Sequence, residues 1–91
     1  MHALITRVTI HDADRTREML NSQVVPGVSS APGFHAGYWT WSSGGKDGVA
    51  MMVFDSEENA RGAGDRVRAA AESSDDVTLD DLEVREVVAS A

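Results

Sequence analysis

The sequence predicts an α+β fold in which two helices cover one face of a four-stranded antiparallel sheet. The evidence is the order of its segments, β-α-β-β-α-β, and a glycine-rich turn at residues 42–48 that joins the two middle strands as a hairpin. Two β-α-β halves around a hairpin form the ferredoxin-like fold, and right-handed crossovers place both helices on the same face. The chain has 91 residues, so we expect residues 1–91 to form a single domain.

The first half of the chain predicts one strand and one helix. Residues 3–10 alternate apolar and polar side chains and are rich in β-branched residues, which is typical of a strand. Asp12 or Asp14 can then cap a helix over residues 15–23 through a side-chain oxygen. We expect Pro26 and Gly27 to end this helix, because the residue before a proline avoids helical geometry. A loop over residues 28–33 follows.

The second half predicts three strands and a second helix. Residues 34–41 are rich in aromatic side chains, and residues 49–54 are apolar on both alternating faces; both segments are predicted strands. Ser56 caps the second helix, which runs to about residue 71 with an inward stripe of small residues. Residues 82–89 alternate as an edge strand does. The acidic segment 73–81 is predicted to connect to this strand, and a lid or a dimer contact are its alternatives.

Composition limits the classes of function. The net charge of −7 argues against nucleic acid and anionic membranes as partners, because binding phosphate groups requires a basic surface. The absence of cysteine excludes disulfides, thiolate nucleophiles and cysteine-type zinc sites. No apolar run is long enough to span a membrane, and no signal-like segment is present, so we expect a cytoplasmic protein.

The apolar and aromatic content predicts a homodimer. Two helices cover only one sheet face, yet strand 49–54 is apolar on both faces and strand 34–41 carries aromatic side chains on both. Contiguous exposed apolar patches of several hundred Å² are rare on monomers. The simplest cover for the second face is the same face of another copy, in a twofold contact.

Two stretches carry a resemblance to a known family. They are Pro-Gly-Phe-His-Ala-Gly at residues 32–37 and Phe-Asp-Ser-Glu-Glu-Asn-Ala at residues 54–60. With the element order, they make the chain similar to the dimeric α/β-barrel superfamily, and within it to the antibiotic-biosynthesis-monooxygenase type of small domain. The resemblance implies oxidation of a small aromatic or polyketide-like substrate by O₂ without a bound cofactor. This superfamily also hosts other enzymes and members without known activity.

Haem-degrading members of the superfamily have an asparagine on the first strand and an iron-ligating histidine on the second helix. This chain has Thr6 at the first position, and its second helix has neither histidine nor tryptophan, so haem ligation by that scheme is not expected. The three histidines also lack the spacing of a metal site, so we expect no metal.

The candidate site residues lie on the first two strands. Tyr38 is the predicted hydrogen-bond donor of the pocket, and His35 is a candidate general base. Thr6, Thr40 and Trp39 are predicted to line the substrate site. The alternative for the aromatic residues is that they close the dimer. Arg7 is a further substrate-binding candidate, and its alternative is an ion pair with Glu83 or Glu86 on the last strand.

The rival hypothesis is a structural or ligand-binding dimer without turnover. In this hypothesis every notable aromatic side chain belongs to the interface, and no cavity larger than a few water molecules lies between helices and sheet.

Overall fold

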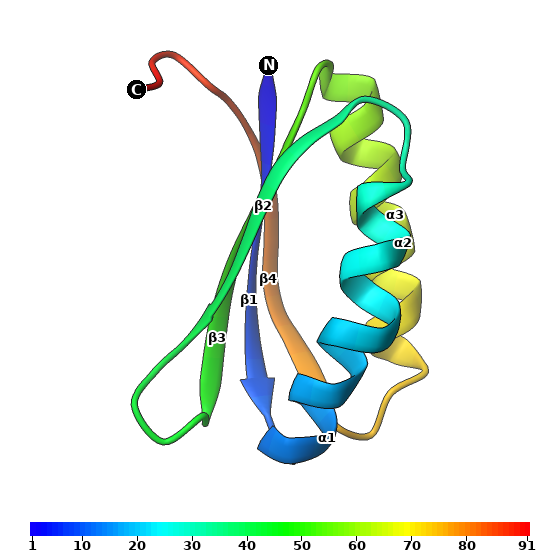
Figure 1. Ribbon diagram of the computed structural model, residues 1–91, viewed down its shortest axis with the longest axis vertical. Helices are drawn as coiled ribbons and strands as arrows, with labels where there is room; N and C mark the ends of the chain where they lie inside the picture. Colours follow the sequence, from blue (N-terminus) through cyan, green and yellow to red (C-terminus); the bar gives the residue numbers. More distant parts are fainter.

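The computed structural model describes residues 1–91 and shows the predicted ferredoxin-like topology (Figure 1). Its elements, in chain order, are β1 (His2–Ile10), α1 (Ala13–Met19), η1 (Leu20–Val24), α2 (Val25–Ser29), β2 (Phe34–Trp41), β3 (Asp47–Phe54), α3 (Glu57–Glu72) and β4 (Val77–Glu86). The four strands form one antiparallel sheet in the order β2-β3-β1-β4. The prediction of fold class is therefore confirmed.

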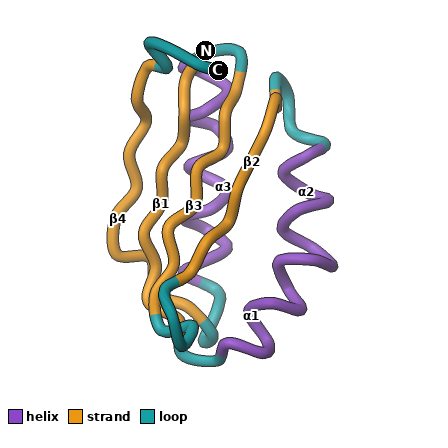
Figure 2. Tube along the Cα trace, turned by 60° about the vertical axis from the view of Figure 1, so that its left-hand side comes forward, coloured by secondary structure: helices purple, strands orange, loops and turns teal.

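All the helices lie on one face of the sheet (Figure 2). The α3 helix packs against β4, β1 and β3, whereas the α1–η1–α2 arm lies beside the β2 edge (Figure 2). The opposite sheet face carries no helix, as predicted. None of the helices has the length and apolar character needed to cross a membrane.

The first helical segment continues past the point where the sequence predicts its end. Asp12 caps α1 as expected, because its carboxylate accepts the Arg15 N–H at 3.1 Å. Pro26 does not end the helix and lies in the first turn of α2. The π-helical turn η1 precedes it, and there the Val25 N–H donates to the Leu20 carbonyl. This wider turn accommodates a proline, which has no N–H to donate and clashes with the carbonyl four residues earlier in a regular helix.

A β-bulge in β2 sets which side chains face the helices. Phe34 pairs with Phe54 and Ala36 pairs with Val53, so His35 is the extra residue between them. After the bulge, Gly37, Trp39 and Trp41 share the helix-covered face with Phe34. In a strand without a bulge, strict alternation would put His35 on the same face as Trp39. The bulge breaks that alternation, because one inserted residue moves each preceding side chain to the other face.

The last strand begins earlier than predicted. β4 spans Val77–Glu86 instead of residues 82–89, so half of the acidic segment 73–81 is strand. Val77 and Leu79 face the helices, while Thr78 and Asp80 do not; the Asp80 carboxylate accepts the Thr9 hydroxyl at 2.6 Å. Acidic residues are compatible with an edge strand, where charge also opposes pairing with another sheet.

The core lies between α3 and the central strands. Leu4, Met52 and Phe54 are fully buried there, against Ala60 and Ala63 of α3. Small residues let α3 approach closely: a Cβ added at Gly64 would lie 3.3 Å from both the Leu4 and the Leu82 side chains. The predicted inward stripe of α3 is therefore present.

The two stretches that carry the family resemblance meet at the top of β3. Gly33 has a φ of 75° and its carbonyl accepts the Asp55 N–H at 2.9 Å. The Asn59 side-chain amide donates to the Asp55 carboxylate at 2.8 Å, directly beside the Gly33 Cα. The two motifs thus form a hydrogen-bonded contact that joins the entry to β2 with the start of α3.

Candidate functional site

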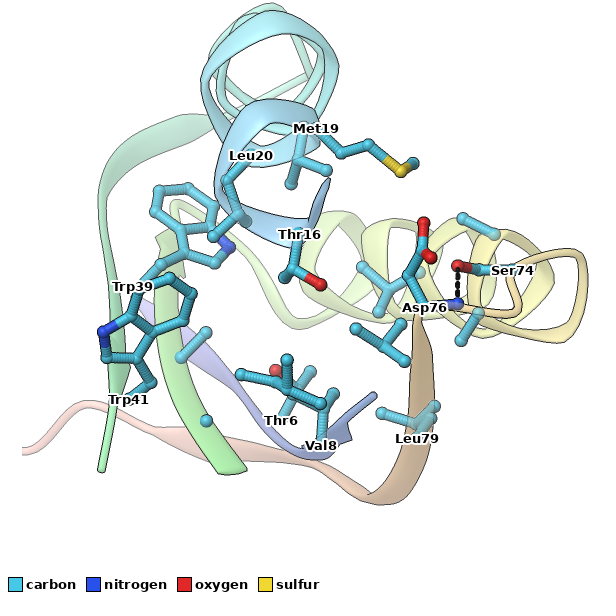
Figure 3. A pocket seen from close by; sticks show the side chains of 18 of the residues that line it. Thr6, Val8, Thr16, Met19, Leu20, Trp39, Trp41, Ser74, Asp76 and Leu79 are labelled. Carbon is cyan, nitrogen blue, oxygen red and sulfur yellow. Dashed lines mark hydrogen bonds between the residues drawn. The ribbon is translucent and has the colours of Figure 1, made fainter. Parts of the chain in front are cut away.

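A cavity of about 650 Å³ lies between the sheet and the helices. Its floor is formed by β1 and β3, its roof by the α1–η1 segment, and one side by the second half of α3. Most of its lining is apolar, and Figure 3 shows Leu20 and Met19 above Thr6 and Val8. A cavity of this size falls within the range of about 300–1,000 Å³ that small-molecule sites occupy.

Two tryptophans form the wall of the cavity on the β2 side. Trp39 and Trp41 lie one above the other at this end (Figure 3). Gly37 makes room for the Trp39 ring, because a Cβ there would come within 2.8 Å of the indole. The Arg17 guanidinium lies 4.7 Å from the centre of the Trp41 ring, which is cation–π geometry. The wall is therefore a held aromatic surface suited to a flat apolar molecule.

Although Arg17 and Thr40 line the cavity on the tryptophan side, some of the polar lining lies away from the tryptophans. Thr16, Ser74 and Asp76 line that part of the cavity (Figure 3). The Thr16 hydroxyl donates to the Asp12 carbonyl at 2.7 Å, and the Ser74 hydroxyl accepts the Asp76 N–H at 3.1 Å. The Asp76 side chain is 17% exposed and its Oδ2 lies 3.4 Å from Arg15 Nε. The cavity therefore has the tryptophans on one side and the Asp76 carboxylate on the other.

Three of the predicted site residues line this cavity. Thr6 is 5% exposed and lies on the floor, and Trp39 forms part of the wall. Thr40 lies at the edge, where its hydroxyl donates to the Val49 carbonyl at 2.6 Å. Of the two threonines, Thr6 is the one placed to contact a ligand.

The other three lie outside the cavity. Tyr38 is 71% exposed and faces the uncovered side of the sheet, so its predicted place inside the pocket needs correction. His35 is exposed at the β2 bulge. Arg7 is also exposed; its neighbour on β4 is Asp81, while Glu83 pairs with Arg85 and Glu86 lies opposite His2. Neither predicted acidic partner of Arg7 is in register with it, because β4 starts early and bulges beside Arg7.

The sequence reasoning did not single out the charged residues of the cavity. These are Arg17 and Asp76. Asp76 lies in the segment 73–81 that was predicted to be a connection, and Arg17 lies on the predicted helix 15–23, for which no pocket-lining residue was predicted. The signal that could have found Asp76 is its place just before Val77 and Leu79, which alternate as strand residues do.

The groups with perturbed pKa values lie elsewhere. The hydrogen bond and charge of Arg61 lower the pKa of the Glu57 carboxyl, and the hydrogen bond and charge of Glu83 raise the pKa of Arg85. Both pairs are on the surface. No group of three or more histidine, aspartate or glutamate side chains is arranged to hold a metal ion.

The rival hypothesis predicted no cavity beyond a few water molecules, and the observed cavity corrects it. Trp39 and Trp41 line this cavity and do not belong to the uncovered sheet face. The fold and the cavity together define an α+β protein of ferredoxin-like topology with a small-molecule-sized site between sheet and helices.

No protein-family model and no curated protein matches the chain. Among solved structures, it is similar to SnoaB, a cofactor-independent oxygenase from Streptomyces nogalater, with a TM-score of 0.74 and 17% identity over 98% of this chain and 94% of that chain. An asparagine-to-alanine mutant of SnoaB gives a TM-score of 0.72 and 15% identity over the same shares. These two structures share the fold of this chain, so the fold that the family resemblance implies is confirmed.

Proposed function

We propose that this chain is a cofactor-independent monooxygenase that oxidises a small aromatic or polyketide-like molecule inside the cavity. The observation that carries the proposal is the largely apolar cavity of about 650 Å³ with an aromatic wall. The fold shared with a cofactor-independent oxygenase supports the same chemistry. Thr6 and Trp39 are the proposed ligand contacts, one on the floor and one on the wall.

The proposed reaction converts an activated CH₂ group of the substrate into a carbonyl. The carbon loses a proton, and the resulting carbanion reacts with O₂ to form a C–O bond and a peroxide anion. The peroxide anion takes up a proton to become a hydroperoxide. Loss of water from the hydroperoxide gives the C=O group. The balance is R₂CH₂ + O₂ → R₂C=O + H₂O, so O₂ accepts all four electrons.

The residues of the chain would hold the ring and exclude water from this reaction. Trp39 and Trp41 offer a flat surface for the ring, and the α1–η1 segment covers it from above. Covering the ring in this way limits competing proton transfer from bulk water to the carbanion.

Oxygen uptake with anthrone as the substrate tests the proposal, using a matched pair of variants on one helix. Ala71 lines the cavity, whereas Ala69 is exposed and does not. We expect Ala71→Leu to reduce the rate by at least ten-fold and Ala69→Leu to leave it unchanged. Equal rates for wild type and Ala71→Leu, or no rate above buffer, would remove the proposal. Saturable binding without oxygen uptake would instead support the non-catalytic ligand-binding dimer.

The predicted catalytic roles of Tyr38 and His35 are tested in the same assay. Both side chains lie outside the cavity, so we expect Tyr38→Phe and His35→Ala to oxidise anthrone at the wild-type rate. A loss of ten-fold or more in either variant, with an unchanged oligomeric state, would return that residue to the catalytic site.

We also propose that the uncovered sheet face packs against a second copy of the chain. Tyr38, Met51 and Val49 are 71%, 45% and 37% exposed on this face. Sedimentation should give twice the 9.7 kDa mass of one chain. Met51→Glu should shift it toward one chain, while Ala69→Glu, which adds the same charge on exposed α3, should not. A wild-type mass of 9.7 kDa at micromolar concentration would contradict the dimer.

A further inference from the structure

Asp76 is the one acidic side chain that lines the cavity, and Arg17 is the one basic side chain. Arg17 is exposed and stacks on Trp41. Asp76 lies on the other side of the cavity, and its carboxylate points toward the α1 side in Figure 3. The two charges therefore stand at different ends of an otherwise neutral lining.

The backbone of Asp76 is held on both sides. Its carbonyl accepts the His11 N–H at 2.7 Å, and its N–H donates to the Ser74 hydroxyl at 3.1 Å. These bonds fix Asp76 at the start of β4 and, with it, the origin of the side chain. The carboxylate is therefore presented from a rigid position, unlike a charge at the tip of a mobile loop.

The carboxylate is only partly satisfied by the protein. Its Oδ2 meets Arg15 Nε at 3.4 Å, and the Arg15 side chain is 71% exposed. Oδ1 remains free to accept a hydrogen bond. An ionised carboxylate can accept hydrogen bonds but cannot donate them. A ligand that shields it from water must therefore offer a hydrogen-bond donor, because burying the charge without one is costly.

We infer that Asp76 orients the ligand by accepting a hydrogen bond from an aromatic hydroxyl, and so selects hydroxylated rings over their ethers. The inference rests on the proposed function insofar as it takes the occupant to be aromatic. The ring lies against the Trp39 and Trp41 wall, and the hydroxyl lies at the Asp76 end. Asp76 is in this sense a specificity-determining residue.

The test is a calorimetric titration of the protein with 1-naphthol and with its methyl ether, 1-methoxynaphthalene. In the ether a methyl group replaces the hydroxyl hydrogen, so only 1-naphthol can donate a hydrogen bond to the carboxylate. A hydrogen bond to a charged group predicts a preference for naphthol of roughly ten-fold or more in the wild type. Asp76→Asn should reduce this preference to about three-fold or less, because a neutral amide replaces the carboxylate.

Asp75→Asn is the matched control, since it removes the same charge one residue away, at an exposed position outside the cavity. It should keep the wild-type preference. Arg15→Gln provides a second variant that leaves the carboxylate in place; it should keep or increase the preference, because it removes a competing partner.

An equal affinity for the two probes in the wild type, an unchanged preference in Asp76→Asn, or no binding of either probe would overturn the inference. If the preference disappears in Asp76→Asn while no variant consumes oxygen with anthrone, the oxygenase proposal fails and the role of Asp76 stands. If anthrone is oxidised but the naphthol preference is absent, the role of Asp76 fails and the oxygenase proposal stands.

Discussion

Gly33 lies where the entry to β2 meets the start of α3, and two glycines elsewhere in the chain serve as comparisons for it. Together the three distinguish the cost of a positive φ from the cost of a steric clash. Gly62, in α3, has an ordinary φ and open space around it. Gly44, in the hairpin turn, has a φ of 94° and open space. Gly33 has a φ of 75°, and a Cβ there would lie 2.1 Å from the Asp55 carboxylate and 2.5 Å from the Asn59 amide. Alanine at Gly62 therefore introduces neither backbone strain nor a clash, and alanine at Gly44 introduces backbone strain alone. Alanine at Gly33 introduces both.

The expected free energies of unfolding follow from these environments. Gly62→Ala should raise the free energy of unfolding by about 0.8–1.0 kcal/mol, the helix propensity difference. Gly44→Ala should lower it by about 1–2 kcal/mol, the cost of left-handed geometry for an ordinary residue. Gly33→Ala carries that cost and also displaces the exposed Asp55–Asn59 hydrogen bond, which adds about 0.5–1.5 kcal/mol, so its total loss is about 1.5–3.5 kcal/mol.

Urea unfolding followed by tryptophan fluorescence measures all three, at one protein concentration, because association would itself shift the apparent stability. The order of stability should be Gly62→Ala, wild type, Gly44→Ala, Gly33→Ala. If Gly33→Ala is no less stable than Gly44→Ala, the contact with Asp55 and Asn59 is not the reason that glycine occupies this position.

Further predictions concern the helix termini and one surface pair. Ser56→Ala should lower the free energy of unfolding by about 1 kcal/mol in urea, because the Ser56 hydroxyl accepts the Asn59 N–H at 3.1 Å; Ser42→Ala, in the hairpin turn, is the control. In carbon NMR, the Glu57 carboxyl should titrate below its ordinary pKa of 4.5, and Arg61→Gln should restore the ordinary value. Since the folded pKa is lowered, the stabilisation by this pair is present above pH 4.5 and is lost as the pH falls below it. An unchanged Glu57 titration in Arg61→Gln would contradict this assignment.

The layout of the sheet could be predicted from the sequence because it depends on local patterns. Alternation in residues 3–10, the glycine-rich turn and the Ser56 cap each report on a few neighbouring residues. Side-chain period and turn chemistry fix the element order, and handedness then fixes the topology. For the same reason, the small residues of α3 correctly predicted its buried face.

The departures from prediction arise at two element boundaries that residue preference alone places wrongly. Pro26 ordinarily ends a helix, yet the π turn before it allows the helical arm to extend over the cavity. The acidic residues at 75–81 suggest a solvated connection, yet Val77 and Leu79 pair with β1 and bring Asp76 to the cavity. The π turn has no signature within a short window of sequence, whereas the alternation of Val77 and Leu79 is a local signal that the neighbouring acidic residues obscured.

The bulge at His35 decides which of the predicted site residues can meet a ligand. Without it, a strict alternation from Phe34 would place Tyr38 with Phe34 on the helix-covered face and turn both tryptophans outward. With it, Phe34 packs edge-on against Phe54 at 5.8 Å, and Trp39 and Trp41 line the cavity. The same residue therefore moves Tyr38 to the face proposed for the second copy. A single inserted residue thus separates the two uses of the aromatic strand, ligand contact on one face and association on the other.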